Sequence, residues 1–281
     1  MQFKTTGNEK ILLVEDNLVN CEIAIDMLET IGFDADVANN GQQALDLYDR
    51  NQYILILMDC EMPVMDGYSA TRHIRSREKK LQNSSEVKAS IPIIALTAHV
   101  MDSTKEKCIA IGMNDFLGKP FNLSDLKLIL SKWLETEVIN VSMHRHHKFC
   151  VAHSINIDDI KSDEVVLNYK FMEKFYLKQK RDGSNLISNI INIYIDQSSI
   201  LLNDLTEATE KKDAESARLA LHTLKSSSDN VGALMFADLC RNAEKTCLKN
   251  NIDQTLLSQI YQSYSKVDKA LKTILNNVGG W

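Results

Sequence analysis

Two side chains of this sequence can carry a phosphoryl group covalently. Asp59 ends the apolar run ILILMD, and His222 opens the helical stretch HTLKSSSDNVGA. A carboxylate can attack phosphorus to form an aspartyl phosphate, and a neutral imidazole can attack through a ring nitrogen. Their presence in one chain predicts that phosphoryl groups are passed between side chains.

Charged and polar residues follow the apolar runs of the first half of the chain. Glu15 and Asp16 follow the first run, Asp59 the third, Thr97 the fourth and Lys119 the fifth. Because the carboxyl ends of parallel strands meet at one edge of a sheet, we expect these residues to lie together. Three converging carboxylates require a cation, and Mg2+ takes such oxygen ligands beside a phosphate. We expect Asp59 to be the nucleophile, with Lys119 and Thr97 as donors to the phosphoryl oxygens.

The residues around His222 predict an exposed imidazole. A helical projection at about 100° per residue places Arg218, Lys225, Ser226 and Asp229 on the side of His222, with alanine, leucine and valine on the opposite side. A largely neutral imidazole keeps the lone pair that nucleophilic attack needs. Lys225, one turn away, is expected to stabilise the transferred phosphoryl group.

The elements that position Asp59 form an α/β pattern. Short apolar runs alternate with amphipathic stretches from Lys10 to about Glu135, which predicts five parallel strands joined by helices. The strands are expected at 11–14, near 37, at 54–58, at 92–96 and near 116, and the helices are expected to begin near residues 18, 41, 67, 101 and 123.

The second half of the chain predicts an all-helical bundle. All three prolines precede Phe121, so no proline interrupts long helices there. The helices are expected at about 165–180, 184–209, 213–230, 233–249 and 253–275. A polar, histidine-rich stretch precedes them, and we assign residues 1–135 and 165–281 to two domains with residues 136–164 as a linker.

The first half resembles the receiver domain of response regulators. The resemblance covers about residues 8–135 and is carried by LLVEDN, LMDCEMPVMDG, ALTA and NDFLGKP. It implies a flavodoxin-like five-stranded parallel sheet, phosphorylation of Asp59, and reorientation of Thr97 and Phe116 when Asp59 is phosphorylated. It also implies a set of Mg2+ ligands: Asp16, Asp59, Glu15 close by and the backbone carbonyl of Glu61.

The second half resembles the histidine phosphotransfer domain over about residues 165–275. The resemblance is carried by His222-x-x-Lys225 followed by Ser227, Ser228, Gly232 and Ala233. It implies a four-helix bundle that carries phosphate between receivers without using ATP. Ser226 departs from the commoner glycine but is still small. We hypothesise that Leu219, beside the histidine stripe, helps to bind the first helix of a receiver.

The two resemblances together imply a multistep phosphorelay protein. Asp59 would accept a phosphoryl group from an upstream histidine kinase in Mg2+-dependent chemistry, and His222 would carry it to or from a downstream receiver domain. The sequence EDN with Asn20 is typical of receivers fused to hybrid sensor kinases. The alternative is that Asp59 controls a non-catalytic helical interaction or dimerisation module. The charged stripe around His222 favours the relay, because a dimer interface favours apolar residues.

Composition excludes several other functions. The net charge of −6 without a basic stripe argues against direct binding of nucleic acid. Ten glycines include no GxGxG or P-loop, so the chain is not expected to hold an ATP-binding kinase domain. No apolar run approaches the ~18 residues of a membrane span. We therefore expect no membrane contact from this segment, and a cytoplasmic protein or the cytoplasmic portion of a membrane-bound sensor kinase.

The cysteines and the remaining histidines give weaker signals. Six cysteines at irregular spacings predict reduced thiols, with Cys240 and Cys247 as small core residues and Cys60 as a weak candidate for redox sensitivity. One group of residues in the linker could hold a metal but matches no closed zinc site: His144, His146, His147, Cys150 and His153.

Overall fold

The computed structural model consists of two compact units, an α/β unit and a helical unit. It describes residues 10–82, 90–98, 102–134, 166–168, 172, 175, 179, 183–247 and 254–278. None of the helices in these ranges is both long and apolar enough to cross a membrane. The predicted linker, with its histidines and Cys150, lies outside the described residues, so the predicted domain boundaries stay predictions.

The α/β unit contains one parallel sheet. Its strands are β1 (Lys10–Val14), β2 (Asp34–Ala38), β3 (Tyr53–Asp59), β4 (Ile93–Thr97) and β5 (Asp115–Gly118). They pair in the order β2-β1-β3-β4-β5, which is the flavodoxin-like order and confirms the predicted fold class. The central strands are nearly continuous apolar runs because both faces of the sheet are covered.

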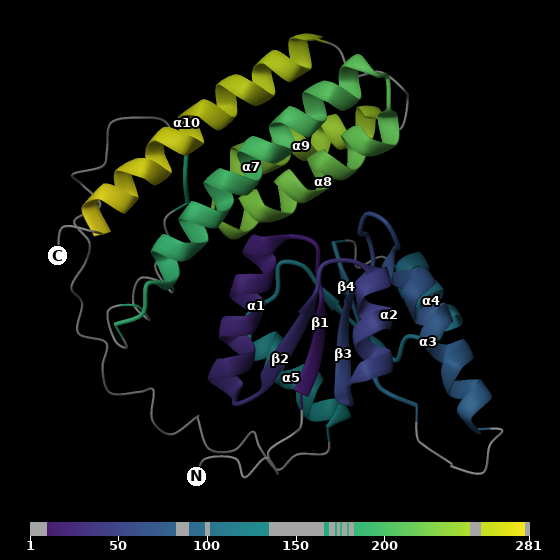
Figure 1. The fold of residues 1–281 in the computed structure, drawn as a ribbon. Coiled ribbons are helices and arrows are strands. Elements are labelled where there is room, and N and C mark those ends of the chain that lie inside the picture. The colour runs from purple at the N-terminus through teal and green to yellow at the C-terminus, as the bar shows by residue number, and fades with distance from the viewer. Residues whose placement is uncertain are drawn as a thin grey trace. The chain divides into compact units, whose positions relative to one another are not determined.

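Helices cover both faces of this sheet. They are α1 (Leu18–Ile31), α2 (Gly41–Arg50), α3 (Gly67–Gln82), α4 (Asp102–Ile111) and α5 (Leu123–Trp133). Figure 1 shows α1 and α5 on one face and α2, α3 and α4 on the other. The beginning of α5 is fixed by a capping box, in which Asn122 and Asp125 each accept a backbone N–H of the other. The sheet edge that carries the strand-end residues is therefore held by a packed three-layer core.

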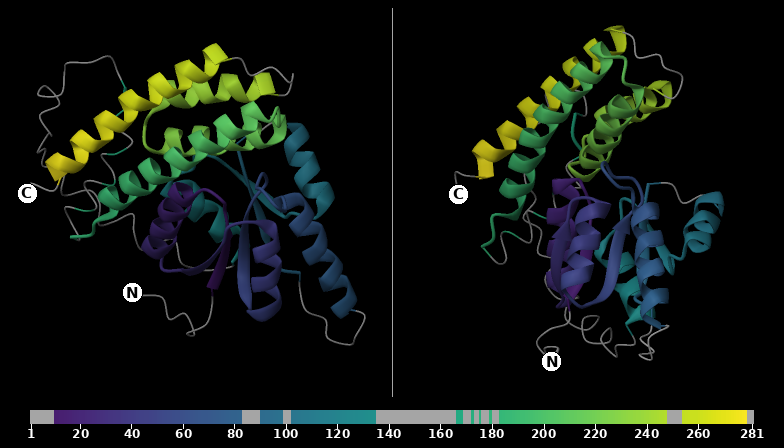
Figure 2. Two further views of the ribbon diagram at one scale, coloured as in Figure 1. Left: turned by 45° about the horizontal axis from the view of Figure 1, so that its top comes forward. Right: turned by 45° about the vertical axis from the view of Figure 1, so that its right-hand side comes forward.

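The long helices of the helical unit, within the residues that the structure describes, form a bundle. Its helices are α7 (Leu186–Glu210), α8 (Ala214–Asn230), α9 (Leu234–Cys247) and α10 (Gln254–Val278). Helix α8 packs against α7 and α9, and α10 packs against the same two helices, which closes the bundle (Figure 2). Leu224, Phe236 and Cys240 are fully or almost fully buried in its core. Cys247 is buried as well, so the predicted core role of both α9 cysteines is confirmed.

The beginning of the predicted helix at 165–180 was wrong. Residues 166–168 are not helical, whereas Met172, Phe175 and Gln179 are. The backbone N–H of Asn168 instead donates to the carbonyl of Gly232, 2.7 Å away in the turn between α8 and α9. The apolar pattern of this segment predicts burial, and Leu167 is indeed buried, but a long-range backbone hydrogen bond takes the place of the first helical turn.

Candidate functional site

Three carboxylates meet at the carboxyl edge of the sheet. Glu15 and Asp16 directly follow β1, and Asp59 is the last residue of β3. One oxygen from each of them lies within 4.8 Å of the other two. Glu15 and Asp59 are buried and Asp16 is partly exposed, so the cluster opens toward solvent on one side. The structure thus brings together the three acids that the sequence singled out.

Lys119 follows β5 and neutralises part of this negative charge. Its Nζ lies 2.5 Å from Oε2 of Glu15 and 2.6 Å from Oδ2 of Asp59. Burial alone would lower the pKa of Lys119, but the charges of Asp59 and Glu15 hold this pKa well above its ordinary value. The backbone N–H of Lys119 donates to the carbonyl of Thr97 at 2.7 Å, which ties the ends of β4 and β5 together. Lys119 is therefore a permanent cation beside Asp59.

The donor set of this cluster suits a hard divalent cation. Carboxylate oxygens at one sheet edge are the ligands that Mg2+ takes in proteins. Glu61 lies beside Asp59, because its backbone N–H donates to Oδ1 of Asp59 at 3.2 Å. Glu15, Asp16 and Asp59 therefore fit Mg2+, and Glu61 is adjacent to them.

The turn that follows Asp59 leaves no room for a side chain at Gly67. A Cβ atom on Gly67 would lie 1.9 Å from the carbonyl oxygen of Asp59, far inside van der Waals contact. The backbone N–H of Gly67 also donates to the carbonyl of Cys60 at 3.2 Å. The first residue of α3 is thus packed directly onto the end of β3, and only glycine allows this approach.

The two residues expected to reorient lie on β4 and β5. Thr97 ends β4 and is buried, and Phe116 in β5 is partly buried. The ammonium of Lys105 lies 4.8 Å from the centre of the Phe116 ring. Both side chains therefore lie on the strands next to Asp59, and their reorientation stays a prediction.

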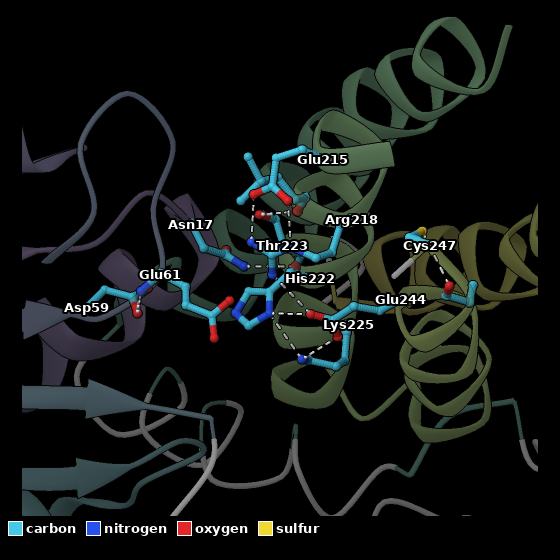
Figure 3. Close-up of polar contacts among 12 residues, drawn as sticks. Asn17, Asp59, Glu61, Glu215, Arg218, His222, Thr223, Lys225, Glu244 and Cys247 are labelled. Atoms are coloured by element: carbon cyan, nitrogen blue, oxygen red, sulfur yellow. Dashed lines mark hydrogen bonds and ion pairs between the residues drawn. The ribbon is translucent and has the colours of Figure 1, made fainter. Parts of the chain in front are cut away.

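The imidazole of His222 is held by a carboxylate from the neighbouring helix. Its Nδ1 lies 2.8 Å from Oε1 of Glu244 on α9, and Nζ of Lys225 lies 2.8 Å from Oε2 of the same carboxylate. Figure 3 shows the three side chains meeting between α8 and α9. The expectation of an exposed imidazole was therefore wrong, because His222 is buried and the helical projection of α8 does not include the side chains of α9.

Glu244 is ionised at neutral pH. Burial alone would raise its pKa, but the hydrogen bond and charge of His222 and the ammonium of Lys225 lower this pKa to about 2. Glu244 was missed by the reasoning from sequence. The available signal was weak: a single acid one position away from Ala243 on the buried face of α9.

Other polar residues near His222 support the helix. Ser227 Oγ donates to the carbonyl of Thr223 at 2.9 Å, and Ser228 Oγ lies 2.9 Å from the hydroxyl of Tyr194 inside the bundle. The two serines of the motif are therefore buried bundle residues. Arg218 pairs with Glu215 at 3.0 Å, and its guanidinium also lies 3.8 Å from Oε1 of Glu244.

Comparison with known proteins assigns both units to families. Residues 11–131 match the family model of the response regulator receiver domain, and residues 189–281 match that of the Hpt domain. The chain therefore contains a receiver domain followed by an Hpt domain. These two domains in one chain are the components of a multistep phosphorelay.

The chain spans only a small part of the length of the curated relatives that it matches. Hybrid signal transduction histidine kinase B of Dictyostelium discoideum is 46% identical over 44% of the chain and 6% of its own length. Sensor protein GacS of Pseudomonas syringae pv. syringae is 26% identical over 93% of the chain and 26% of its own length. The receiver domain of a sensor histidine kinase from Pseudomonas aeruginosa, solved with a magnesium ion coordinated in its active site cleft, is 42% identical. That similarity covers 46% of this chain and 100% of the solved one, with a TM-score of 0.40.

Proposed function

We propose that Asp59 accepts a phosphoryl group from the histidine of an upstream kinase and that His222 carries it to or from a receiver domain. The observation that carries this proposal is the buried Asp59 carboxylate within 2.6 Å of Lys119, in a cluster of three acids at the carboxyl edge of the sheet. A buried nucleophile with a fixed cation beside it matches the needs of in-line phosphoryl transfer.

The residues of this cluster divide the chemistry among them. An oxygen of Asp59 forms the bond to phosphorus while the bond from phosphorus to the donor's ring nitrogen breaks, and the electron pair stays on the donor. Lys119 offsets the charge of the phosphoryl oxygens, and the hydroxyl of Thr97 donates a hydrogen bond to one of them. Glu15, Asp16, Asp59 and the Glu61 carbonyl would hold Mg2+, which would neutralise charge on the transferred group when bound.

His222 is the second carrier in this proposal. It has a nucleophilic ring nitrogen and a lysine on the same helix, but the described residues around it include no metal-binding cluster within the helical unit. In this proposal the receiver supplies the metal and the acid pocket, and the helical unit supplies the imidazole with Lys225 beside it. The partners are a histidine kinase and a receiver, as in the hybrid kinases that the chain resembles.

The chemical stability of the labelled product tests this proposal. The full chain is treated with Mg2+ and radiolabelled acetyl phosphate, then quenched and divided between acid and base. We expect base-labile label that is lost in Asp59→Asn and acid-labile, base-stable label that is lost in His222→Gln.

A label confined to Asp59 would favour the alternative function. If His222 stays unlabelled even with an added phosphorylated receiver domain, the helical unit is a non-catalytic interaction module controlled by Asp59.

A further inference from the structure

Arg75 of α3 holds the chain at the point where it enters β5, at the end of the strand that is opposite the acid cluster. Its Nε donates to the carbonyl of Gly112 at 2.8 Å, and its Nη2 donates to Oδ1 of Asn114 at 2.7 Å. We propose that Arg75 is a positioning residue that fixes the start of β5 and thereby the place of Lys119 at the other end of this strand. This inference rests on the proposed role of Lys119 beside the phosphoryl acceptor Asp59.

The start of β5 is aligned with β4 by one side chain. β5 is a strand of four residues at the end of the sheet, and it pairs with β4. Asn114 directly precedes it, donates its backbone N–H to the carbonyl of Ile93 at 2.8 Å and accepts the N–H of Ile93 on Oδ1 at 2.9 Å. The same Oδ1 accepts the hydrogen bond from Arg75. A strand this short has few backbone hydrogen bonds to fix its register, and a slip by one residue would turn its side chains to the opposite face.

The aliphatic part of Arg75 packs on the turn between α4 and β5. Gly112 ends α4 with a positive φ of 109°. The backbone N–H groups of Gly112 and Met113 donate to the carbonyls of Ile109 and Cys108, each at 3.0 Å. A Cβ atom on Gly112 would lie 3.0 Å from Cγ of Arg75, so this backbone and the arginine are in close contact. Arg75 therefore contacts the turn through its aliphatic part as well as through Nε.

A carboxylate on the same helix keeps the guanidinium in place. Oε2 of Glu78 lies 2.8 Å from Nη1 of Arg75, and Oε1 of Glu78 accepts the backbone N–H of Ile91 at 2.8 Å, just before β4. The side chains of Arg75 and Glu78 are only 15% and 9% exposed. Each of the three guanidinium nitrogens thus has its own acceptor. The planar fork of arginine fits this arrangement, whereas a lysine ammonium does not.

These contacts affect the acid cluster through β5. The strand runs from Asp115 to Gly118, and Lys119 follows it directly. The N–H of Lys119 donates to the carbonyl of Thr97 at 2.7 Å, and its Nζ lies 2.6 Å from Oδ2 of Asp59. Misplacing a reacting group by about 1 Å can slow a reaction about 100-fold. A shift of β5 along β4 would therefore slow phosphorylation by moving the ammonium away from Asp59.

Four substitutions test this role in the full chain. Arg75→Met removes all three donors but keeps an apolar side chain, and Arg75→Lys keeps the charge without the fork. Asn114→Ala removes the acceptor that links Arg75 to β4, and the double variant Arg75→Met, Asn114→Ala tests whether the two residues act together. Arg77→Met is the matched control, because Arg77 lies on the same helix and forms a more exposed pair with Asp49.

Three measurements are made at a temperature at which circular dichroism shows each variant to be folded. The 15N chemical shift of the Lys119 ammonium, assigned by its loss in Lys119→Met, reports the place of this group without any phosphoryl transfer. The initial rate of base-labile label from acetyl phosphate and Mg2+ reports phosphorylation of Asp59. Titration calorimetry reports Mg2+ binding, for which the proposed ligands follow β1 and β3 and not β5. The label that phosphoramidate, a small phosphoryl donor, places on His222 checks that the helical unit is intact.

We expect Arg75→Met and Asn114→Ala to shift the Lys119 resonance and to slow labelling of Asp59 by about 10- to 100-fold, with unchanged Mg2+ affinity. Arg75→Lys should lie between Arg75→Met and the parent. The double variant should lose no more than the more affected single variant, because both substitutions break the same link.

A residue that only stabilises the fold would give a different result. In that case the Lys119 resonance and the labelling rate of folded Arg75→Met would equal those of Arg77→Met, which would overturn the inference. Additive losses in the double variant, or a parallel loss of Mg2+ affinity, would overturn it as well. If Arg75→Met does not fold, Arg75→Lys and Asn114→Ala carry the same test. If the label of the parent persists in Asp59→Asn, the proposed acceptor role itself fails, whereas the Lys119 resonance still tests the role of Arg75.

Discussion

The ammonium of Lys119 lies 2.6 Å from Oδ2 of Asp59. The same ammonium reaches Glu15 at 2.5 Å, so it links the ends of β1, β3 and β5 around the proposed nucleophile. Placing three acids together at one sheet edge, two of them buried, would be costly without such a cation, because like charges in a partly desolvated site repel strongly. The proposed acceptor site is therefore charge-balanced by a residue that also serves the chemistry.

Removing this ammonium should slow phosphorylation of Asp59. We expect Lys119→Met to reduce the rate of labelling by acetyl phosphate and Mg2+ by about 100-fold, the usual effect of losing one preorganised donor. The initial rate of base-labile label measures this. Lys10→Met is the control, because Lys10 belongs to an exposed pair with Asp36. Equal rates for Lys119→Met and Lys10→Met would contradict the role of Lys119.

The acid cluster should bind Mg2+ through Asp16. Asp16→Asn is expected to weaken Mg2+ binding at least ~10-fold in titration calorimetry, since it removes one of the few charged ligands. Asp36→Asn, outside the cluster, should leave the affinity unchanged. Chelation with EDTA should also stop labelling of Asp59 but not direct labelling of His222 by phosphoramidate. Loss of both labels would show that the metal acts beyond the α/β unit.

Two glycine substitutions separate close packing from backbone strain. Gly67→Ala places a Cβ 1.9 Å from the carbonyl oxygen of Asp59 and should lower the free energy of unfolding by about 3 kcal/mol. Gly183→Ala has a positive φ of 71° but nothing within 4 Å of the new Cβ, so about 1 kcal/mol is expected. Urea denaturation followed by circular dichroism measures both. A smaller loss for Gly67→Ala than for Gly183→Ala would mean that α3 moves easily away from β3.

The stability of the helical unit should depend on pH through Glu244. Its pKa is lowered from 4.5 to about 2 in the folded protein, so its contribution is complete above pH 4.5 and is lost as the pH falls toward 2. The contribution is roughly 1–3 kcal/mol. Urea denaturation of the parent and of Glu244→Gln across this range should show a steeper loss in the parent. Parallel curves would mean that Glu244 is not paired in solution.

The hypothesis for Leu219 concerns docking rather than chemistry. Leu219 lies on α8 beside the histidine stripe and is only partly buried. Leu219→Asp should slow transfer between His222 and a receiver at least ~10-fold if the leucine is an apolar anchor of that contact. Labelling by phosphoramidate and the thermal unfolding midpoint should stay close to those of the parent. An unchanged transfer rate would exclude this leucine from the docking surface.

The strand-end residues were predictable because all strands of a parallel sheet end at the same edge, so the residues that follow them lie there together. Once apolar runs alternate with amphipathic helices, Glu15, Asp59 and Lys119 must lie at the same edge, whatever the details of packing. The sequence pattern contained no comparable rule for the helical unit. Projection of α8 gave its buried face correctly, but which side chain of α9 meets His222 depends on the rotation and offset of two packed helices. Glu244, 22 residues away along the chain, could therefore be found only in the structure.

The contact between Nδ1 of His222 and Glu244 also limits the order in which partner domains can react with the ring. If one ring nitrogen is occupied by the protein itself, a single atom of His222 must both receive the phosphoryl group and give it away. A donor and an acceptor domain then cannot react with the ring together, and one has to leave before the next arrives. Transfer through this chain would follow ping-pong kinetics. The rate at which the first partner leaves would then be an upper limit on the rate of phosphoryl transfer through His222.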